Sequence, residues 1–337
     1  MQFQLSLTPT PLPESIDHRQ RMLLLGSCFT EHIGDALRDW KFPVMQNPHG
    51  ILFGPDAIAT ALNDYLTAKV YSDDELFQLN ECWHSWHHHS RFSDTDKQVA
   101  LHRINDSIRE THEFLRQADW LILTLGSAFT YRLTDRADRG VLNSGDSVAN
   151  CHRAPANWFT KELMTVDEIL NRLQKVIGSL RSRNPRLKLM LTISPVRHIR
   201  DGLVENNRSK ARLIQVVQAM TEQLSDCHYF PAYEYVIDVL RDHRFYDIDL
   251  VHPNYSATQF VLERFSEYAF HPHTRALNDE IRSLLTARRH RVQHPTTDAH
   301  RHFLQAHLQK TLALKDQHPE LELSAELEYF SGMKGSE

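Results

Sequence analysis

The feature that most constrains the fold of this chain is an alternation of short apolar runs with amphipathic segments. Three apolar runs end in small residues or proline: "MLLLGS" from Met22, "WLILTLGS" from Trp120 and "KLMLTISP" from Lys188. Such runs are typical of strands buried on both faces, and the segments between them carry apolar residues three or four positions apart, as on one helical face. The alternation therefore predicts an α/β fold with a parallel sheet covered by helices on both faces.

The same periodicity predicts where the other elements lie. Two weaker strands are expected within residues 42–55 and 227–236. Helices are expected over residues 29–40, 55–69, 99–117, 165–185, 207–226 and 256–270.

Three regions lack this regular alternation. Residues 73–93 are rich in His and Trp and show no clean period, and residues 134–150 are polar, which predicts a loop or a small hairpin around Asn143. From about His271 the chain is polar and helical without a strand. We therefore expect one main domain over residues 1–270 and a C-terminal helical extension over residues 271–337.

Composition narrows the class of protein. A net charge of −5, counted with neutral histidines, gives no electrostatic reason to expect a nucleic-acid partner. No apolar run approaches the roughly 20 residues that span a bilayer, and the first residues do not have the pattern of a signal peptide. The cysteines show no CxxC pair, which favours free thiols and a cytoplasmic location; they are Cys28, Cys82, Cys151 and Cys227.

Gly26, Ser27 and Cys28 form the turn between the first strand and the first helix. A strand-to-helix turn at the carboxyl edge of a sheet directs a side chain and several backbone N–H groups to one point, which suits a nucleophile. Taken alone, the pattern favours a serine that only caps the helix. Cys28 lies one position further along, about 100° around the helix, so we expect it to pack as a small apolar residue.

Asp249 and His252, in "DIDLVHP", supply a second pair of reactive side chains three positions apart, just before a helix. A histidine that activates a serine needs a carboxylate that fixes its tautomer, and an Asp-x-x-His turn provides both groups. Pro253 restricts the backbone of His252. An isolated Asp-x-x-His is more often an exposed polar pair, so the combination with Ser27 carries the prediction.

Other polar clusters have weaker interpretations. His84 and His88 have a helical spacing that suits zinc, but no HExxH motif accompanies them, and a His/Trp-rich flap is the preferred interpretation. Asn150 and His152 line a pocket or hold a loop. Arg197 and His198 follow a strand; Arg197 suits a carboxylate or phosphate ligand, or an ion pair that holds the loop. No Gly-rich phosphate cradle is present, so no cofactor and no metal are predicted.

Several motifs in order make the chain resemble the GSCFA family, which is grouped with the SGNH/GDSL-like hydrolases. The resemblance covers roughly Leu23 to Phe270, and Thr30 stands where the family name has alanine. The motifs are "GSCFTEHIG", "NPHGILFGP", "LTLGSAFTY", "VANCHRAP", "TISPVRHIRDG", "NRSKARL", "YFPAYEYV" and "YDIDLVHPN".

The resemblance implies a three-layer α/β/α fold with Ser27 as nucleophile, His252 as base and Asp249 as its orienting carboxylate. The wider superfamily completes its oxyanion hole with a glycine after the second strand, which Gly50 matches, and with an asparagine in a Gly-x-Asn motif. That asparagine is absent, because the chain reads Gly126-Ser127-Ala128 at the matching place. The Ser127 hydroxyl, a backbone N–H of that loop and Asn47 remain as candidate donors.

The function implied is hydrolysis of an ester of a small molecule or glycan, in which the N–H groups of Ser27 and Gly50 hold the oxyanion. Transfer of the acyl group to another hydroxyl is a close alternative. A binding module that has this fold but no chemistry is an alternative from another class. The oligomeric state is not predicted.

Overall fold

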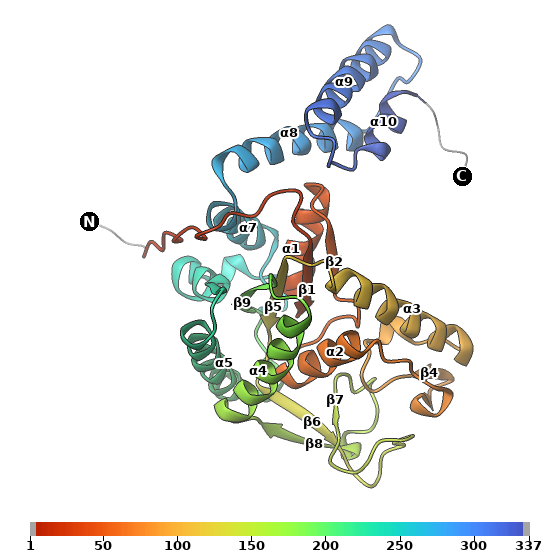
Figure 1. Cartoon of the computed structure of the whole chain (residues 1–337), viewed down its shortest axis with the longest axis vertical. Helices are drawn as coiled ribbons and strands as arrows, with labels where there is room; N and C mark the ends of the chain where they lie inside the picture. The colour runs from red at the N-terminus through yellow and green to blue at the C-terminus, as the bar shows by residue number, and fades with distance from the viewer. Residues whose placement is uncertain (1–4, 333–337) are drawn as a thin grey trace.

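A computed structural model describes residues 5–332 of the chain, and its centre is a five-stranded parallel sheet (Figure 1). The strand order is β10-β9-β5-β1-β2, with every neighbouring pair parallel. The strands are β1 (Met22–Gly26), β2 (Val44–Gln46), β5 (Trp120–Leu125), β9 (Lys188–Ile193) and β10 (Cys227–Phe230).

The order of the strands reverses between β1 and β5. From β1 the chain goes first to β2 on one side and later to β5 on the other, so the carboxyl ends of β1 and β5 form the topological switch point. In sheets of this type, ligands bind outside the carboxyl ends of the strands at that point. Gly26 at the end of β1 pairs with Thr124 of β5, which places the turn at Ser27 there.

Two apolar clusters cover the two faces of the sheet, because neighbouring residues of a strand point to opposite sides. Leu23 and Leu25 pack with α2, α3, α4 and α5. Met22 and Leu24 pack with α1, α7 and the segment that begins at Ala232. The three-layer α/β/α fold is thus confirmed.

Apart from α6, the helices of these layers begin and end close to the predicted positions. The strand expected within residues 227–236 ends at Phe230, because Pro231 has no N–H to donate to the sheet, and the chain is helical from Ala232. The helices are α1 (Cys28–Asp39), α2 (Pro55–Thr67), α3 (Lys97–Leu115), α4 (Val166–Arg183), α5 (Leu203–Gln223), α6 (Ala232–Glu234, continued as a π-helix over Tyr235–Leu240) and α7 (Tyr255–Ala269).

Two small antiparallel sheets lie outside the central sheet. The hairpin considered around Asn143 is present in one of them, where β6 and β7 pair, and the other strands of these sheets were not predicted. One is a hairpin of β3 (Phe77–Leu79) and β4 (Cys82–His84), and its turn residues Asn80 and Glu81 both have positive φ. The other joins β6, β7 and β8 in the order β7-β6-β8. Its strands span Phe129–Leu133, Ser147–Val148 and Phe159–Leu163. These short strands carry too few alternating residues to stand out from loops in the sequence.

The C-terminal helices form a cluster of their own against the amino ends of the strands (Figure 1). They are α8 (Pro272–Arg289), α9 (Asp298–Gln317) and α10 (Ser324–Phe330). The fully buried carboxylate of Glu326 joins them to the sheet: its oxygens lie 2.8 Å from Lys41 Nζ and 2.8 Å from Arg288 Nη1. Lys41 lies just before β2, so these helices pack at the edge opposite Ser27.

No helix of the described chain is both long enough and apolar enough to cross a bilayer.

We predict that Glu326→Gln lowers the free energy of unfolding by about 3 kcal/mol, because it leaves two cations near a buried site without their carboxylate. Urea unfolding measures this loss. Glu328→Gln, an exposed change on the same helix, is the matched control and should stay within about 0.5 kcal/mol of wild type. Equal stability of both variants would contradict the structural role of Glu326.

Candidate active site

Ser27 ends β1 and is the N-cap residue of α1. Its backbone is extended, with φ −70° and ψ 174°, yet its side chain makes no capping hydrogen bond. The Ser27 side chain is fully buried, and its Oγ has no hydrogen-bond partner among residues 5–332. The capping role is therefore absent, and a hydroxyl without a partner stands at the switch point of the sheet.

Asn47 follows β2 and packs directly against the turn at Ser27. Its backbone adopts a positive φ of 46°, and its Oδ1 accepts a hydrogen bond of 2.9 Å from the N–H of Gly26. The Asn47 side chain is fully buried, but its Nδ2 has no acceptor within the described chain. A buried amide donor is thus left unused next to Ser27.

Gly50 closes the loop after β2 in a conformation that glycine adopts most easily. Its φ is +82°, and a Cβ at this position would lie 2.1 Å from Cβ of His89. The preceding residue, His49, is buried and contacts the Tyr65 hydroxyl at 2.6 Å and the Asp64 carboxylate at 3.3 Å. These contacts hold the loop, and burial lowers the pKa of His49 although Asp64 opposes the shift.

The two backbone N–H groups expected to hold an oxyanion both donate within the protein. The N–H of Gly50 donates to the Asn47 carbonyl at 2.6 Å, and that of Ser27 to the Thr124 carbonyl at 3.3 Å. Among the other donors considered for this role, only Asn47 Nδ2 is unengaged in the described structure.

The loop after β5 has no free donor in the described structure. The N–H groups of Gly126 and Ser127 donate to the Phe53 carbonyl at 2.9 and 3.0 Å. The Ser127 hydroxyl contacts Ser209 Oγ at 3.3 Å and accepts from the N–H of Phe129.

Asp249 and His252 form the expected pair on the loop before α7. His252 Nδ1 lies 2.7 Å from Asp249 Oδ2, while the other carboxylate oxygen accepts from the N–H groups of Val251 and His252. These hydrogen bonds lower the pKa of the Asp249 carboxyl to about 2, with the His252 side chain as the largest cause. The carboxylate fixes Nδ1 as the protonated nitrogen, so Nε2 is left as the basic atom.

The structure does not join this pair to Ser27 by a hydrogen bond, since Ser27 Oγ has no partner. The loop does belong to the carboxyl edge, because the N–H of Arg197, just after β9, donates to the Val251 carbonyl at 3.2 Å. The His252 side chain is 47% exposed, whereas Ser27 is sealed.

Arg91 lies over the segments that flank Ser27. It donates to the Asn47 carbonyl and approaches the Glu31 carboxylate, in the first turn of α1, at 3.7 Å. The Arg91 side chain therefore connects the loop after β2 with α1, the helix that begins next to Ser27.

Arg197 and His198 occupy different surroundings. The Arg197 guanidinium lies 4.5 Å from the centre of the Tyr246 ring and contacts His243 Nε2 at 3.3 Å, so it packs against the loop that carries His252. The His198 ring meets that of Phe53 edge-on at 5.5 Å.

Asn150 and His152 lie in the loop between β7 and β8. Asn150 Oδ1 accepts from the N–H of His152, whose Nε2 contacts the Ser85 carbonyl at 2.8 Å. His152 is buried beside Phe77 and Trp86, and burial lowers its pKa to about 4. Both residues therefore hold a loop, one of the two roles expected for them.

The histidine-rich stretch does not have the helical geometry that would suit a metal. His84 lies in β4, and His88 stacks on His49 with ring centroids 4.0 Å apart. Within residues 5–332 no three His, Cys, Asp or Glu side chains converge as a metal site.

Sequence reasoning missed two residues of α5 that reach the carboxyl edge. The buried Lys210 donates from Nζ to the carbonyls of Gly126 and Ser194, and Ser209 Oγ accepts from the N–H of Ala128 at 2.7 Å. The motif "NRSKARL" contains both, but a helical Ser-Lys pair has no sequence signal that separates it from a solvated face.

Cys28 is half-buried at the start of α1, and burial raises the pKa of its thiol. The N–H groups of Cys28 and Phe29 and the charge of Lys210 oppose that shift. A thiol with a raised pKa is a weaker nucleophile at neutral pH, which favours Ser27 over Cys28.

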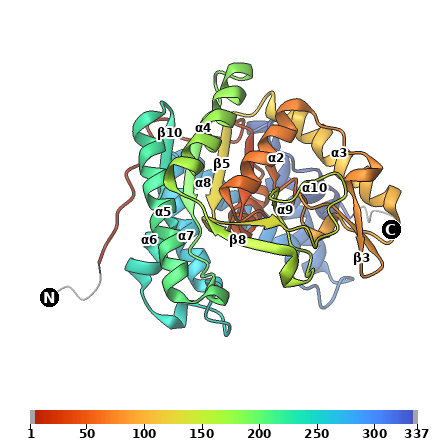
Figure 2. The same ribbon diagram turned by 90° about the horizontal axis from the view of Figure 1, so that it is seen from below.

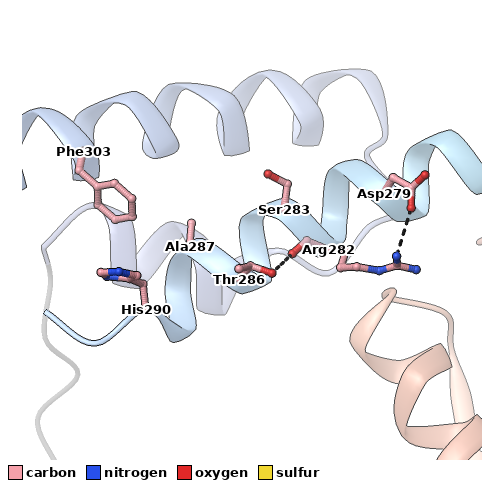
Figure 3. Close-up of a pocket in the computed structure, with 7 residues that line it drawn as sticks. All are labelled: Asp279, Arg282, Ser283, Thr286, Ala287, His290 and Phe303. Carbon is pink, nitrogen blue, oxygen red and sulfur yellow. Dashed lines mark hydrogen bonds and ion pairs between the residues drawn. The ribbon is translucent and has the colours of Figure 1, made fainter. Parts of the chain in front are cut away.

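Two surface hollows lie on the C-terminal helices, at the opposite edge of the sheet. One, of about 480 Å³, lies between α8 and α9 (Figure 3) and gathers no unpaired buried group. The other, of about 260 Å³, lies where α7 meets α8. Seen from below, the C-terminal helices, in blue, lie behind the main domain (Figure 2).

Two family models match most of the sequence, whereas the solved structures of similar proteins are only distantly similar to this chain. The model of the GSCFA family matches residues 21–265, and that of the GSCFA domain protein, C-terminal domain, matches residues 281–333. No curated protein sequence matches the chain.

Two solved structures of similar fold are a carbohydrate esterase family 3 protein from Talaromyces cellulolyticus and an acetyl esterase mutant with an acetate ion. The first is 11% identical and the alignment covers 77% of this chain and 99% of that one, with a TM-score of 0.36. The second is 12% identical over 78% of this chain and 99% of that one, also at 0.36. Similarity at this level gives no information about the activity of this chain.

We predict that the pKa of Asp249 lies near 2 in wild type and rises toward 3.8 in His252→Ala, because the largest cause of the shift is removed. The backbone N–H donors of residues 251 and 252 remain in this variant and keep the pKa from rising fully. The pair of Asp249 and His252 stabilises the folded protein at pH values above the pKa that Asp249 has in the unfolded chain. This stabilisation is lost as the pH falls through the pKa of Asp249 in the folded protein. Carboxyl-carbon NMR titration measures both values, and equal titration in the two proteins would contradict the pair.

Proposed function

The chain belongs to the GSCFA family, and we propose that it is a serine ester hydrolase that uses Ser27, His252 and Asp249. One observation carries the proposal: Ser27 Oγ and Asn47 Nδ2 are both buried without a partner at the same turn. Buried polar atoms are normally satisfied, so two unpaired ones at a switch point fit a nucleophile and an oxyanion donor that await a substrate.

The proposed reaction follows from the chemistry of these side chains. Ser27 Oγ attacks the ester carbonyl carbon, and His252 Nε2 takes the hydroxyl proton while Asp249 holds Nδ1. The alcohol leaves with the proton from His252, and an acyl group remains on Ser27. Water, activated by the same histidine, then releases the acid.

Asn47 takes the place of the missing Gly-x-Asn donor in this proposal. Its Oδ1 is fixed by the N–H of Gly26, so its Nδ2 is oriented before substrate binds. A donor that is already oriented stabilises the charge that develops on the carbonyl oxygen without reorganisation.

Access to Ser27 requires an opening, since its hydroxyl is sealed in the structure. Arg91 is the side chain that spans the two segments beside it. We propose that movement of the segment around Arg91 exposes Ser27 and allows His252 to approach it. The substrate class proposed is an ester of a small molecule or glycan, with transfer of the acyl group to another hydroxyl as the variant.

We predict that a fluorophosphonate probe labels wild type and Cys28→Ala but not Ser27→Ala. His252→Ala should label at least about 100-fold more slowly, because the base is lost. Intact-mass measurement after timed labelling gives the rates. Failure of folded wild type to label would overturn the hydrolase proposal and favour a binding module.

We predict that Asn47→Asp lowers kcat for an ester substrate by at least about 100-fold, because the change keeps the oxygen acceptor and removes the amide donor. Asn150→Asp is the matched control, since it makes the same change in an asparagine whose oxygen accepts from the N–H of His152. Wild-type kcat in Asn47→Asp would exclude Asn47 as the oxyanion donor.

A further inference from the structure

The proposed reaction gives no role to the motif "NRSKARL", which supplies Lys210. This lysine is only 2% exposed, and its ammonium donates to the carbonyl of Gly126 at 2.7 Å and to that of Ser194 at 2.6 Å. Gly126 follows β5 and Ser194 follows β9, which are neighbouring strands. One buried ammonium therefore joins the ends of two central strands at the carboxyl edge.

Lys210 has no carboxylate partner within the part of the chain that the structure describes. The groups that face it are the Cys28 thiol from α1, the Tyr233 ring with its centre 5.9 Å away, and the two carbonyl oxygens. Burial without a counter-charge lowers the pKa of Lys210 to about 7. Burying an unpaired cation is costly, and such groups gather at functional sites.

Ser209, the residue before Lys210, holds the same loop. Its Oγ accepts from the N–H of Ala128 at 2.7 Å and lies 3.3 Å from Ser127 Oγ. Ser209 and Lys210 together contact all three residues of Gly126-Ser127-Ala128. This loop stands where the wider superfamily carries its Gly-x-Asn donor.

We infer that Lys210 is a positioning residue of the active site: it fixes the β5 loop beside Ser27 and places a buried positive charge near the first turn of α1. The inference rests on the proposed function. An ammonium has three N–H donors, and the two carbonyls occupy two of them. A fixed positive charge in a water-poor site stabilises negative charge that develops on a bound acyl group.

The first test compares Lys210→Met, which removes the charge, with Lys210→Arg, which keeps it at every pH. Arg208→Met, an exposed change on the same helix, is the matched control. The rate of fluorophosphonate labelling of Ser27 is measured between pH 6 and about 9 for each protein. Lys210→Met should label at least about 100-fold more slowly than wild type at pH 6.5, and Arg208→Met should match wild type.

The pH dependence of the labelling rate distinguishes an electrostatic role of Lys210 from a purely structural one. In wild type the labelling rate should fall as the pH rises above about 7, because Lys210 loses its proton there. Lys210→Arg should show no fall in that range, since its guanidinium stays charged. Labelling of Lys210→Met at the wild-type rate would overturn the inference.

A second measurement tests the inference independently of fluorophosphonate labelling. If no protein reacts with the probe, only the proposed function is refuted, and this measurement still tests the role of Lys210. Wild type is prepared with carbonyl-labelled glycine, and the Gly126 carbonyl resonance is followed by NMR as the pH changes. The resonance should shift with a midpoint near pH 7, because its hydrogen-bond donor changes charge. A Gly126 resonance that is the same in wild type and in Lys210→Met would overturn the role of Lys210.

Discussion

The close approach of β1 to β5 is the constraint on which the candidate site depends. A Cβ on Gly26 would lie 2.3 Å from the Thr124 carbonyl oxygen, and the φ of Gly26 is +148°, so a larger residue would push the two strand ends apart. Because the strands meet here, the turn at Ser27, the Asn47 amide and the loop after β5 share one edge. The hydrogen bond from the N–H of Gly26 to Asn47 Oδ1 uses the same contact.

Two kinds of support surround this edge. Behind the loop after β2, buried His49, Asp64, Tyr65 and Tyr71 form a hydrogen-bonded network, with the Tyr71 hydroxyl donating to Asp64 at 2.8 Å. Behind the loop after β5, Ser209 and Lys210 reach from α5. Both supports come from helices on the same face of the sheet, which leaves the other face to α1 and α7.

The long apolar strands, their helices and the two halves of the candidate site could be predicted from the sequence, because periodicity and an ordered set of motifs are local signals. The Asp249–His252 pair is local too, and it formed as expected. The β3–β4 hairpin, the strand β8, the engaged N–H groups of Ser27 and Gly50, and the roles of Asn47 and Lys210 could not be predicted. Each depends on which atoms a distant segment brings near, such as the Gly126 carbonyl that meets Lys210 from 84 positions away.

The pairing of Met22 with Trp120 also bears on how the chain acquires its structure. These partners lie about a hundred positions apart, so the centre of the sheet forms only after a long loop closes, which slows folding. During synthesis, β1 leaves the ribosome well before β5. Until β5 follows, the edge of β1 that pairs with β5 has no partner strand. A nascent chain of this kind is a natural client for chaperones that shield strand edges, and the candidate site is complete only when α5 and α7 have followed.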